Sequence, residues 1–151
     1  MPQHTVDAVD EVIIRELQAD GRRPYTHLAK TVGLSEAAIR QRVQRLIDQE
    51  VMQVVAVTDP VSLGFQRAAM VAITVDGDMR RVARALAELD EVVYVVLAAG
   101  SIDVLAEVVV VDDEALLTLL NDRIRLFPGV PTTETSIYLS IEKQTYQWGT
   151  R

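Results

Sequence analysis

A short turn between two amphipathic segments places the strongest constraint on the fold of this chain. The tripeptide Gly33-Leu34-Ser35 separates residues 24–32 from residues 36–49. Glycine readily adopts the positive φ angle that a tight turn between helices requires, and Ser35 can cap the next helix by accepting hydrogen bonds from its first amides. The sequence therefore predicts two helices joined in a helix-turn-helix.

One more helix is predicted before this pair. Asp7 and Asp10 have the spacing of a reciprocal capping arrangement at a helix N-terminus. Apolar residues then recur at helical spacing until Asp20-Gly21, which ends the segment. The space between the later two helices is expected to be filled by Leu28, Val32, Leu34 and Ile39.

The charge distribution favours a nucleic-acid partner for this region. The whole chain has a formal net charge of −7. Between Gly21 and Leu46, six basic residues against one acidic residue give +5, which leaves −12 for the rest of the chain. A basic stretch on an acidic body is typical of local DNA binding. A solvated charged face without a partner would have the same composition.

The outer face of residues 36–49 carries the candidate DNA contacts. Arg40 and Gln41 point away from the predicted core and can hydrogen-bond guanine and adenine edges in the major groove. Arg42 and Arg45 lie on the flanks of the helix and are expected to act mainly on phosphate. The full set of candidate DNA-binding residues is Arg23, Thr26, Ser35, Glu36, Ala37, Arg40, Gln41, Arg42, Gln44 and Arg45.

The second half of the chain alternates between strand and helix patterns. Strands are predicted over residues 68–75, 92–98, 104–111 and 133–141, and helices after Asp78 and after Asp112 or Asp113. This β-α-β-β-α-β order predicts a ferredoxin-like domain behind the helix-turn-helix, so the fold class is α+β.

The expected domain organisation follows from these patterns. Residues 1–50 form the DNA-binding domain, and residues 51–64 form a linker strand or hinge, with the strand itself over 51–58. Residues 65–145 form an α/β domain for effector binding and oligomerisation. Residues 146–151 are a tail that holds Trp148, which is the only tryptophan and either packs on a partner subunit or is disordered.

Two of the predicted strands indicate self-association. Residues 92–98 and 104–111 are apolar at nearly every position. Two helices can cover only one face of a four-stranded sheet, so the other face needs a cover, and a second copy of the chain is the simplest one. Because Val108 and Val109 point to opposite faces, a charge at one of them should unfold the domain and a charge at the other should dissociate the dimer.

Several function classes lack the residues they need. The chain has no cysteine, and His4 and His27 are too few and too far apart for a metal site. The run Asp112-Asp113-Glu114 is interpreted as helix capping. No nucleophile elbow, signal-peptide core or bilayer-length apolar run is present. We therefore expect no enzyme activity, cofactor, metal or membrane partner, and a cytoplasmic location.

The order and spacing of these segments resemble the Lrp/AsnC (leucine-responsive/asparagine-responsive) family of regulators. The matching stretches are Val6-Asp7 with Asp10, Asp20-Gly21-Arg22, Leu28-Ala29-Lys30, Val32 to Ser35, Ile39 to Leu46, Asp59-Pro60, Leu63-Gly64, Gly100 with Asp103, Leu126 to Val130 and Thr133 to Ile137. The resemblance implies that the C-terminal half is a regulator of amino-acid metabolism domain. It also implies dimers, tetramers or octamers, and a response to amino acids or related metabolites.

The resemblance also suggests an effector site, whose candidate residues are Ala99, Gly100, Ser101 and Asp103. The family turn is usually Gly-Asp-Tyr-Asp, and here it is Gly100-Ser101-Ile102-Asp103. Asp103 could pair with the ammonium group of an amino acid. Alternatively, Gly100 serves the turn and Asp103 hydrogen-bonds its backbone. Glu50 replaces the glycine that commonly ends the recognition helix, and Glu134 replaces a common arginine.

These observations predict a sequence-specific DNA-binding transcription regulator whose C-terminal domain senses a small metabolite and sets the oligomeric state. Two alternatives stay open. One is an architectural protein that bridges DNA without an effector, and the other is a small-ligand enzyme built on the ferredoxin-like half, for which no acid/base pair is visible.

Overall fold

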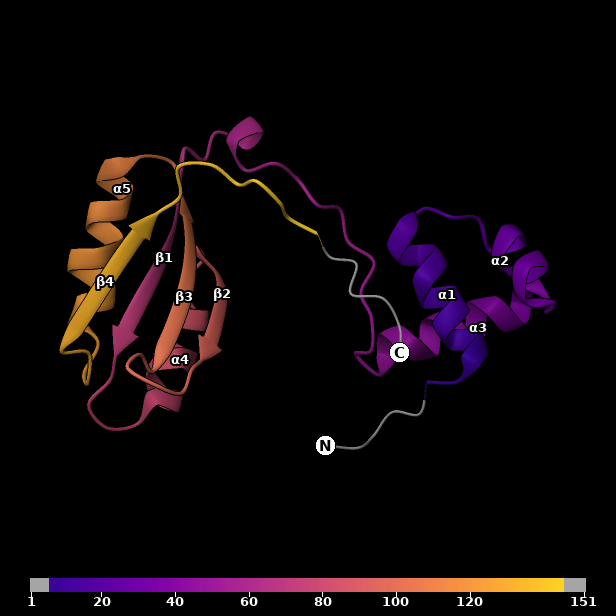
Figure 1. The fold of residues 1–151 in the computed structure, drawn as a ribbon, viewed down its shortest axis with the longest axis horizontal. Helices are drawn as coiled ribbons and strands as arrows, with labels where there is room; N and C mark the ends of the chain where they lie inside the picture. The colour runs from indigo at the N-terminus through magenta and orange to yellow at the C-terminus, as the bar shows by residue number, and fades with distance from the viewer. Residues whose placement is uncertain (1–5, 146–151) are drawn as a thin grey trace. The chain divides into compact units, whose positions relative to one another are not determined.

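The computed structural model describes residues 6–145, and the chain divides into two compact units (Figure 1). The first unit contains α1 (Ala8–Ala19), α2 (Tyr25–Val32) and α3 (Glu36–Asp48), and it extends to Val57. The second unit runs from Thr58 to Glu142 and contains a four-stranded sheet with its helices. Trp148 and the predicted tail lie outside the described residues.

The helix ends of the first unit have the caps that the sequence predicts. The Asp7 carboxylate accepts a hydrogen bond from Asp10 N at 2.8 Å, and the Asp10 carboxylate accepts one from Asp7 N at 3.2 Å. Ser35 Oγ accepts a hydrogen bond from Ala38 N at 3.2 Å at the start of α3. Gly33 takes the left-handed conformation, with φ of 72°, between α2 and α3. The turn chemistry therefore sets the path of the chain between these helices.

The three helices close a core of their own, which consists of Ile13, Leu17, Leu28, Ala29, Ile39, Val43 and Leu46. The expectation that Leu34 fills the space between the helices is wrong. Leu34 is 36% exposed, because it follows the left-handed Gly33 and the turn carries it past the point where α2 and α3 cross.

The strand predicted over residues 51–58 is also wrong, because this segment is extended without ladder pairing. A strand is stabilised by the hydrogen bonds of a neighbouring strand, and this segment pairs with none in the described part of the chain. Its valines at 54, 55 and 57 are exposed. At the other end of α3, Glu50 has φ of 56°, so a non-glycine residue occupies the left-handed conformation after the recognition helix.

The second unit is an antiparallel sheet of order β2-β3-β1-β4 (Figure 1). Its strands are β1 (Arg67–Thr74), β2 (Val92–Leu97), β3 (Val104–Val110) and β4 (Thr132–Ile137), so the last strand is shorter than the sequence predicts. The helices are α4 (Met79–Ala87) and α5 (Asp113–Thr118), and α5 continues through a π turn and a 3-10 turn to Leu126. This order is that of a ferredoxin-like fold, which confirms the predicted α+β class.

The two faces of the sheet differ in burial. On β1 and β3, alternate residues from Ala69 to Ile73 and from Val104 to Val110 are buried against Val82 and Leu86 of α4 and Leu116 of α5. The residues between them point to the other face and are half-buried: Ala68, Met70, Ala72, Leu105, Glu107 and Val109. We call this second surface the open face. Beyond β4, Leu139 is 99% exposed.

Candidate DNA interface and effector region

The exposed side of α3 presents the predicted base-contacting residues. Arg40 is 67% exposed, and its guanidinium lies 5.2 Å from the centroid of the Tyr25 ring on α2. Arg40 Nη2 is also 3.3 Å from Glu36 Oε1, one turn earlier on α3. Gln41 is exposed beside it. Tyr25 and Glu36 therefore orient Arg40 from two sides before any ligand is present.

Arg42 and Arg45 lie in a different environment from Arg40. Arg42 Nη1 is 2.6 Å from Asp7 Oδ2 and 2.8 Å from Asp10 Oδ1, and Arg45 Nη2 is 2.5 Å from Asp10 Oδ2. The Asp10 side chain is fully buried. The two arginines therefore hold the middle of α3 against the N-terminus of α1.

The ionisation of these groups is consistent with this arrangement. The hydrogen bond from Arg42 holds the pKa of Asp7 below its ordinary value, and the Asp7 and Asp10 carboxylates raise the pKa of Arg42. Sequence analysis missed this internal role, because the partners stand 32 to 35 residues away along the chain. Phosphate contact by Arg42 and Arg45 stays a prediction.

The remaining candidate residues divide into paired and unpaired side chains. Arg23 forms an ion pair with Glu16 of α1, and Gln44 Nε2 donates to Asp48 Oδ1 at 2.8 Å. Thr26, Ser35 and Ala37 are exposed. Arg22 and Lys30 are also exposed, and their side chains have no partner among residues 6–145. Sequence analysis left these two cations out of the candidate set, although both belong to the basic stretch that it identified.

Asp103 links the predicted effector turn to the end of β1. Its Oδ2 accepts a hydrogen bond from Val75 N at 2.8 Å, and its own N–H donates to Ile73 O at 3.1 Å. Gly100 has φ of 143°, a conformation that favours glycine. These contacts match the structural alternative for Gly100 and Asp103. Asp103 Oδ1 has no hydrogen-bond partner in the described part of the chain, and Ala99 and Ser101 are exposed.

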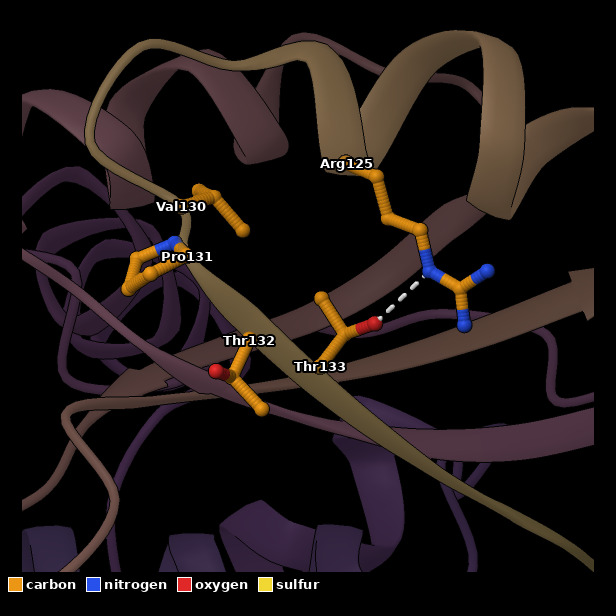
Figure 2. A pocket seen from close by; sticks show the side chains of 5 residues that line it. All are labelled: Arg125, Val130, Pro131, Thr132 and Thr133. Atoms are coloured by element: carbon orange, nitrogen blue, oxygen red, sulfur yellow. Dashed lines mark hydrogen bonds between the residues drawn. The ribbon is translucent and has the colours of Figure 1, made fainter.

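A cavity of about 290 Å³ lies at the start of β4 and is lined by Arg125, Val130, Pro131, Thr132 and Thr133 (Figure 2). Arg125 Nε donates to Thr133 Oγ1 at 3.0 Å, and Arg125 Nη1 donates to Asn121 Oδ1 at 2.6 Å. Thr132 pairs with Thr74, so the cavity lies at the same end of the sheet as the Asp103 turn. None of the predicted effector residues lines it.

Two searches of residues 6–145 bear on other site types. This part of the chain contains no group of three or more histidine, aspartate or glutamate side chains placed to hold a metal ion. Its helices are also too short or too polar to cross a membrane.

Both units match known protein families. Residues 6–47 match the AsnC-type helix-turn-helix domain, and residues 68–148 match the Lrp/AsnC ligand binding domain. An HTH-type transcriptional regulator of Pyrococcus furiosus is 34% identical over 143 residues, which cover 93% of this chain and 97% of that protein. The leucine-responsive regulatory protein of Salmonella typhimurium is 32% identical, with coverage of 95% and 91%.

Solved structures agree with these matches. A feast or famine regulatory protein from M. tuberculosis, in complex with L-methionine, has a TM-score of 0.84 at 32% identity and covers 95% of this chain and 98% of its own. Family models therefore match both halves of the sequence, in the same order as the two structural units. The chain belongs to the Lrp/AsnC family of transcriptional regulators.

Proposed function

We propose that this protein regulates transcription by reading a specific DNA sequence with α3. The observation that carries the proposal is the orientation of Arg40, which Tyr25 and Glu36 hold in an exposed position on a helix capped by Ser35. A guanidinium held in this way loses little conformational freedom when it binds a guanine edge. Gln41 is suited to adenine on the same face.

The other polar residues of the first unit have different roles in this proposal. Arg22 and Lys30 contact phosphate, because their charges are not neutralised within the described chain. Asp10, through Arg42 and Arg45, is a positioning residue that fixes the angle of α3 against α1.

The experiment selects bound DNA from a random pool with the wild type and with Arg40→Ala. We expect Arg40→Ala to weaken the selected site by about 1–3 kcal/mol and to relax preference at one position of each half-site. Lys30→Ala is the matched control, which should weaken all sequences alike and lower the salt slope by about 1. Identical specificity profiles for the two variants contradict the division between base and phosphate contacts.

We propose that an amino acid is the effector of the C-terminal domain. Support comes from the match to a ligand binding domain and from the relative whose structure contains L-methionine. Within this chain, the unpartnered Asp103 Oδ1 is available to an ammonium group. Ile102 makes the turn apolar, so methionine and the branched amino acids are the first ligands to test.

Calorimetry with the twenty amino acids tests the effector proposal. Asp103→Asn keeps an oxygen that can accept the hydrogen bond from Val75 N and removes only the charge, so the turn should stay intact. We expect ligand binding to the wild type and its loss in the variant. Equal binding to both proteins would contradict this role of Asp103, and binding to neither would favour the architectural alternative.

We also propose that a second copy covers the open face. This face presents Met70, Leu105 and Val109 at its centre, and the apolar residues Leu139 and Ile141 follow at the end of β4. Light scattering at micromolar concentration measures the mass directly. A folded monomer of the wild type would contradict the proposal.

A further inference from the structure

Three arginines of the second unit differ from the other three in their surroundings. Arg67 pairs with Asp113, Arg123 pairs with Glu91, and Arg125 bonds Asn121 and Thr133. The remaining three are all exposed on α4, and no side-chain partner is present for them within residues 6–145: Arg80, Arg81 and Arg84.

The helix geometry places these three charges together. Val82 and Leu86 are buried and fix the side of α4 that contacts the sheet. At 3.6 residues per turn, Arg80, Arg81 and Arg84 fall within an arc of about 100° on the opposite side. Arg80 and Arg84 are one turn apart, about 6 Å along the axis. We call this surface the α4 arginine face.

This arrangement is unfavourable for the isolated domain. Arg80 and Arg81 lie in the first turn of α4, where the helix dipole disfavours positive charge. The pairs at i,i+3 and i,i+4 repel each other. Residues 58–142 contain fourteen acidic residues, six arginines and no lysine, yet none of these acids pairs with the α4 side chains within the described chain. Nothing in the fold explains the face, and an anionic partner would.

We propose that the α4 arginine face binds the phosphate backbone of the DNA beside the site that α3 reads. This inference rests on the proposed DNA-binding function. Arginine forms two parallel hydrogen bonds to phosphate, and this pairing needs no base sequence. Once α3 has bound its site, the flanking duplex is held near the second unit at high effective concentration, so a weak contact becomes populated.

The test compares a selected duplex of about two helical turns with the same duplex extended by about three turns at each end. The variant is the full chain with Arg80→Gln, Arg81→Gln and Arg84→Gln. The control variant, with Arg67→Gln, Arg123→Gln and Arg125→Gln, removes the same net charge from arginines that already have partners. The measurement is the dependence of log affinity on log salt concentration for both duplexes.

We expect the wild type to show a steeper salt slope on the long duplex than on the short one. The α4 variant should lose up to about 0.9 of slope per phosphate contact, hence up to about 2.7, on the long duplex only. The control variant should keep both wild-type slopes. A thermal melt serves as the folding check, because removal of the repulsion on α4 should leave the melting temperature unchanged or raise it.

Three results would overturn the inference. Equal wild-type slopes on the two duplexes would show that the second unit does not contact flanking DNA, while the function of α3 still stands. An equal loss on both duplexes would assign the effect to the overall field of the protein. Unchanged binding by the α4 variant would leave the face to an acidic protein partner. Failure of the wild type to bind either duplex would instead refute the proposed function itself.

Discussion

The first unit completes its own core, whereas the second unit does not. In the first unit, α1, α2 and α3 enclose residues such as Ile13, Leu28 and Ile39 on all sides. In the second unit, two helices cover one face of the sheet and the open face keeps half-buried apolar residues. The comparison shows that three helices can enclose a small core among themselves, while a sheet always has two faces to cover. We therefore expect mutations in the first unit to act locally and mutations in the second unit to act through association.

The largest expected effect comes from Val108→Asp. Val108 is fully buried between the sheet and its helices. A carboxylate at that position has no partner, so the substitution should destabilise the second unit by at least about 4 kcal/mol and unfold it. Circular dichroism should show loss of strand signal while the helices of the first unit remain. A fully folded variant would contradict the assignment of this face to the core.

Val109→Asp places the same charge one residue later, on the open face. Val109 is only half-buried in the single chain, so we expect the variant to fold. It should sediment as a monomer at concentrations at which the wild type is a dimer, because the charge would be buried at the interface between two sheets. A Val109→Asp dimer as stable as the wild type would show that the open face is not the contact surface.

In the first unit, Asp10→Asn removes the buried charge that faces Arg42 and Arg45. The amide oxygen can still accept the capping hydrogen bond, so the loss isolates the ion pairs. Because both arginines are partly exposed, we expect about 1–3 kcal/mol of destabilisation in urea titration. The dimer mass should not change. DNA specificity should relax in protein that is still folded, since α3 loses its anchor on α1, and an unaltered specificity profile would limit Asp10 to a stabilising role.

Glu50→Gly should have a smaller effect of opposite sign. A non-glycine residue in the left-handed conformation costs about 1–2 kcal/mol, and glycine loses about 0.5–1 kcal/mol more chain entropy on folding. The substitution should therefore stabilise the first unit by roughly 0.5–1 kcal/mol. A rise in the melting temperature of the first unit, with no change in mass, is the measurement. Destabilisation would indicate that the Glu50 side chain makes a compensating contact.

Acid titration should weaken both units slightly. The pKa of Asp7 is lowered by Arg42 in the first unit, and the pKa of Asp113 is lowered by Arg67 in the second. A lowered pKa in the folded state stabilises above the unfolded value near about 3.9, and the contribution disappears as pH falls below it. Asp7→Asn should remove this pH dependence from the first unit alone. An unchanged acid profile in that variant would assign the effect to other carboxylates.

Local signals in the sequence determined the helices, their caps and the strand order of this protein. The Asp7 and Asp10 capping pair, the Gly33 turn and the alternation of strand and helix patterns act within a few residues, so they can be read before the chain folds. The outward position of Arg40 and Gln41 follows from the helix period alone.

Only the tertiary structure decided which charges are used inside the protein. Arg40, Arg42 and Arg45 look alike in the sequence, yet Arg42 and Arg45 meet Asp10 across the fold while Arg40 stays exposed. Residues 51–58 have a strand pattern but no strand beside them, and Asp103 meets the end of β1 across 28 residues. Ion pairs, ladders and such anchors depend on which distant segments become neighbours, and a local pattern carries no information about distance in space.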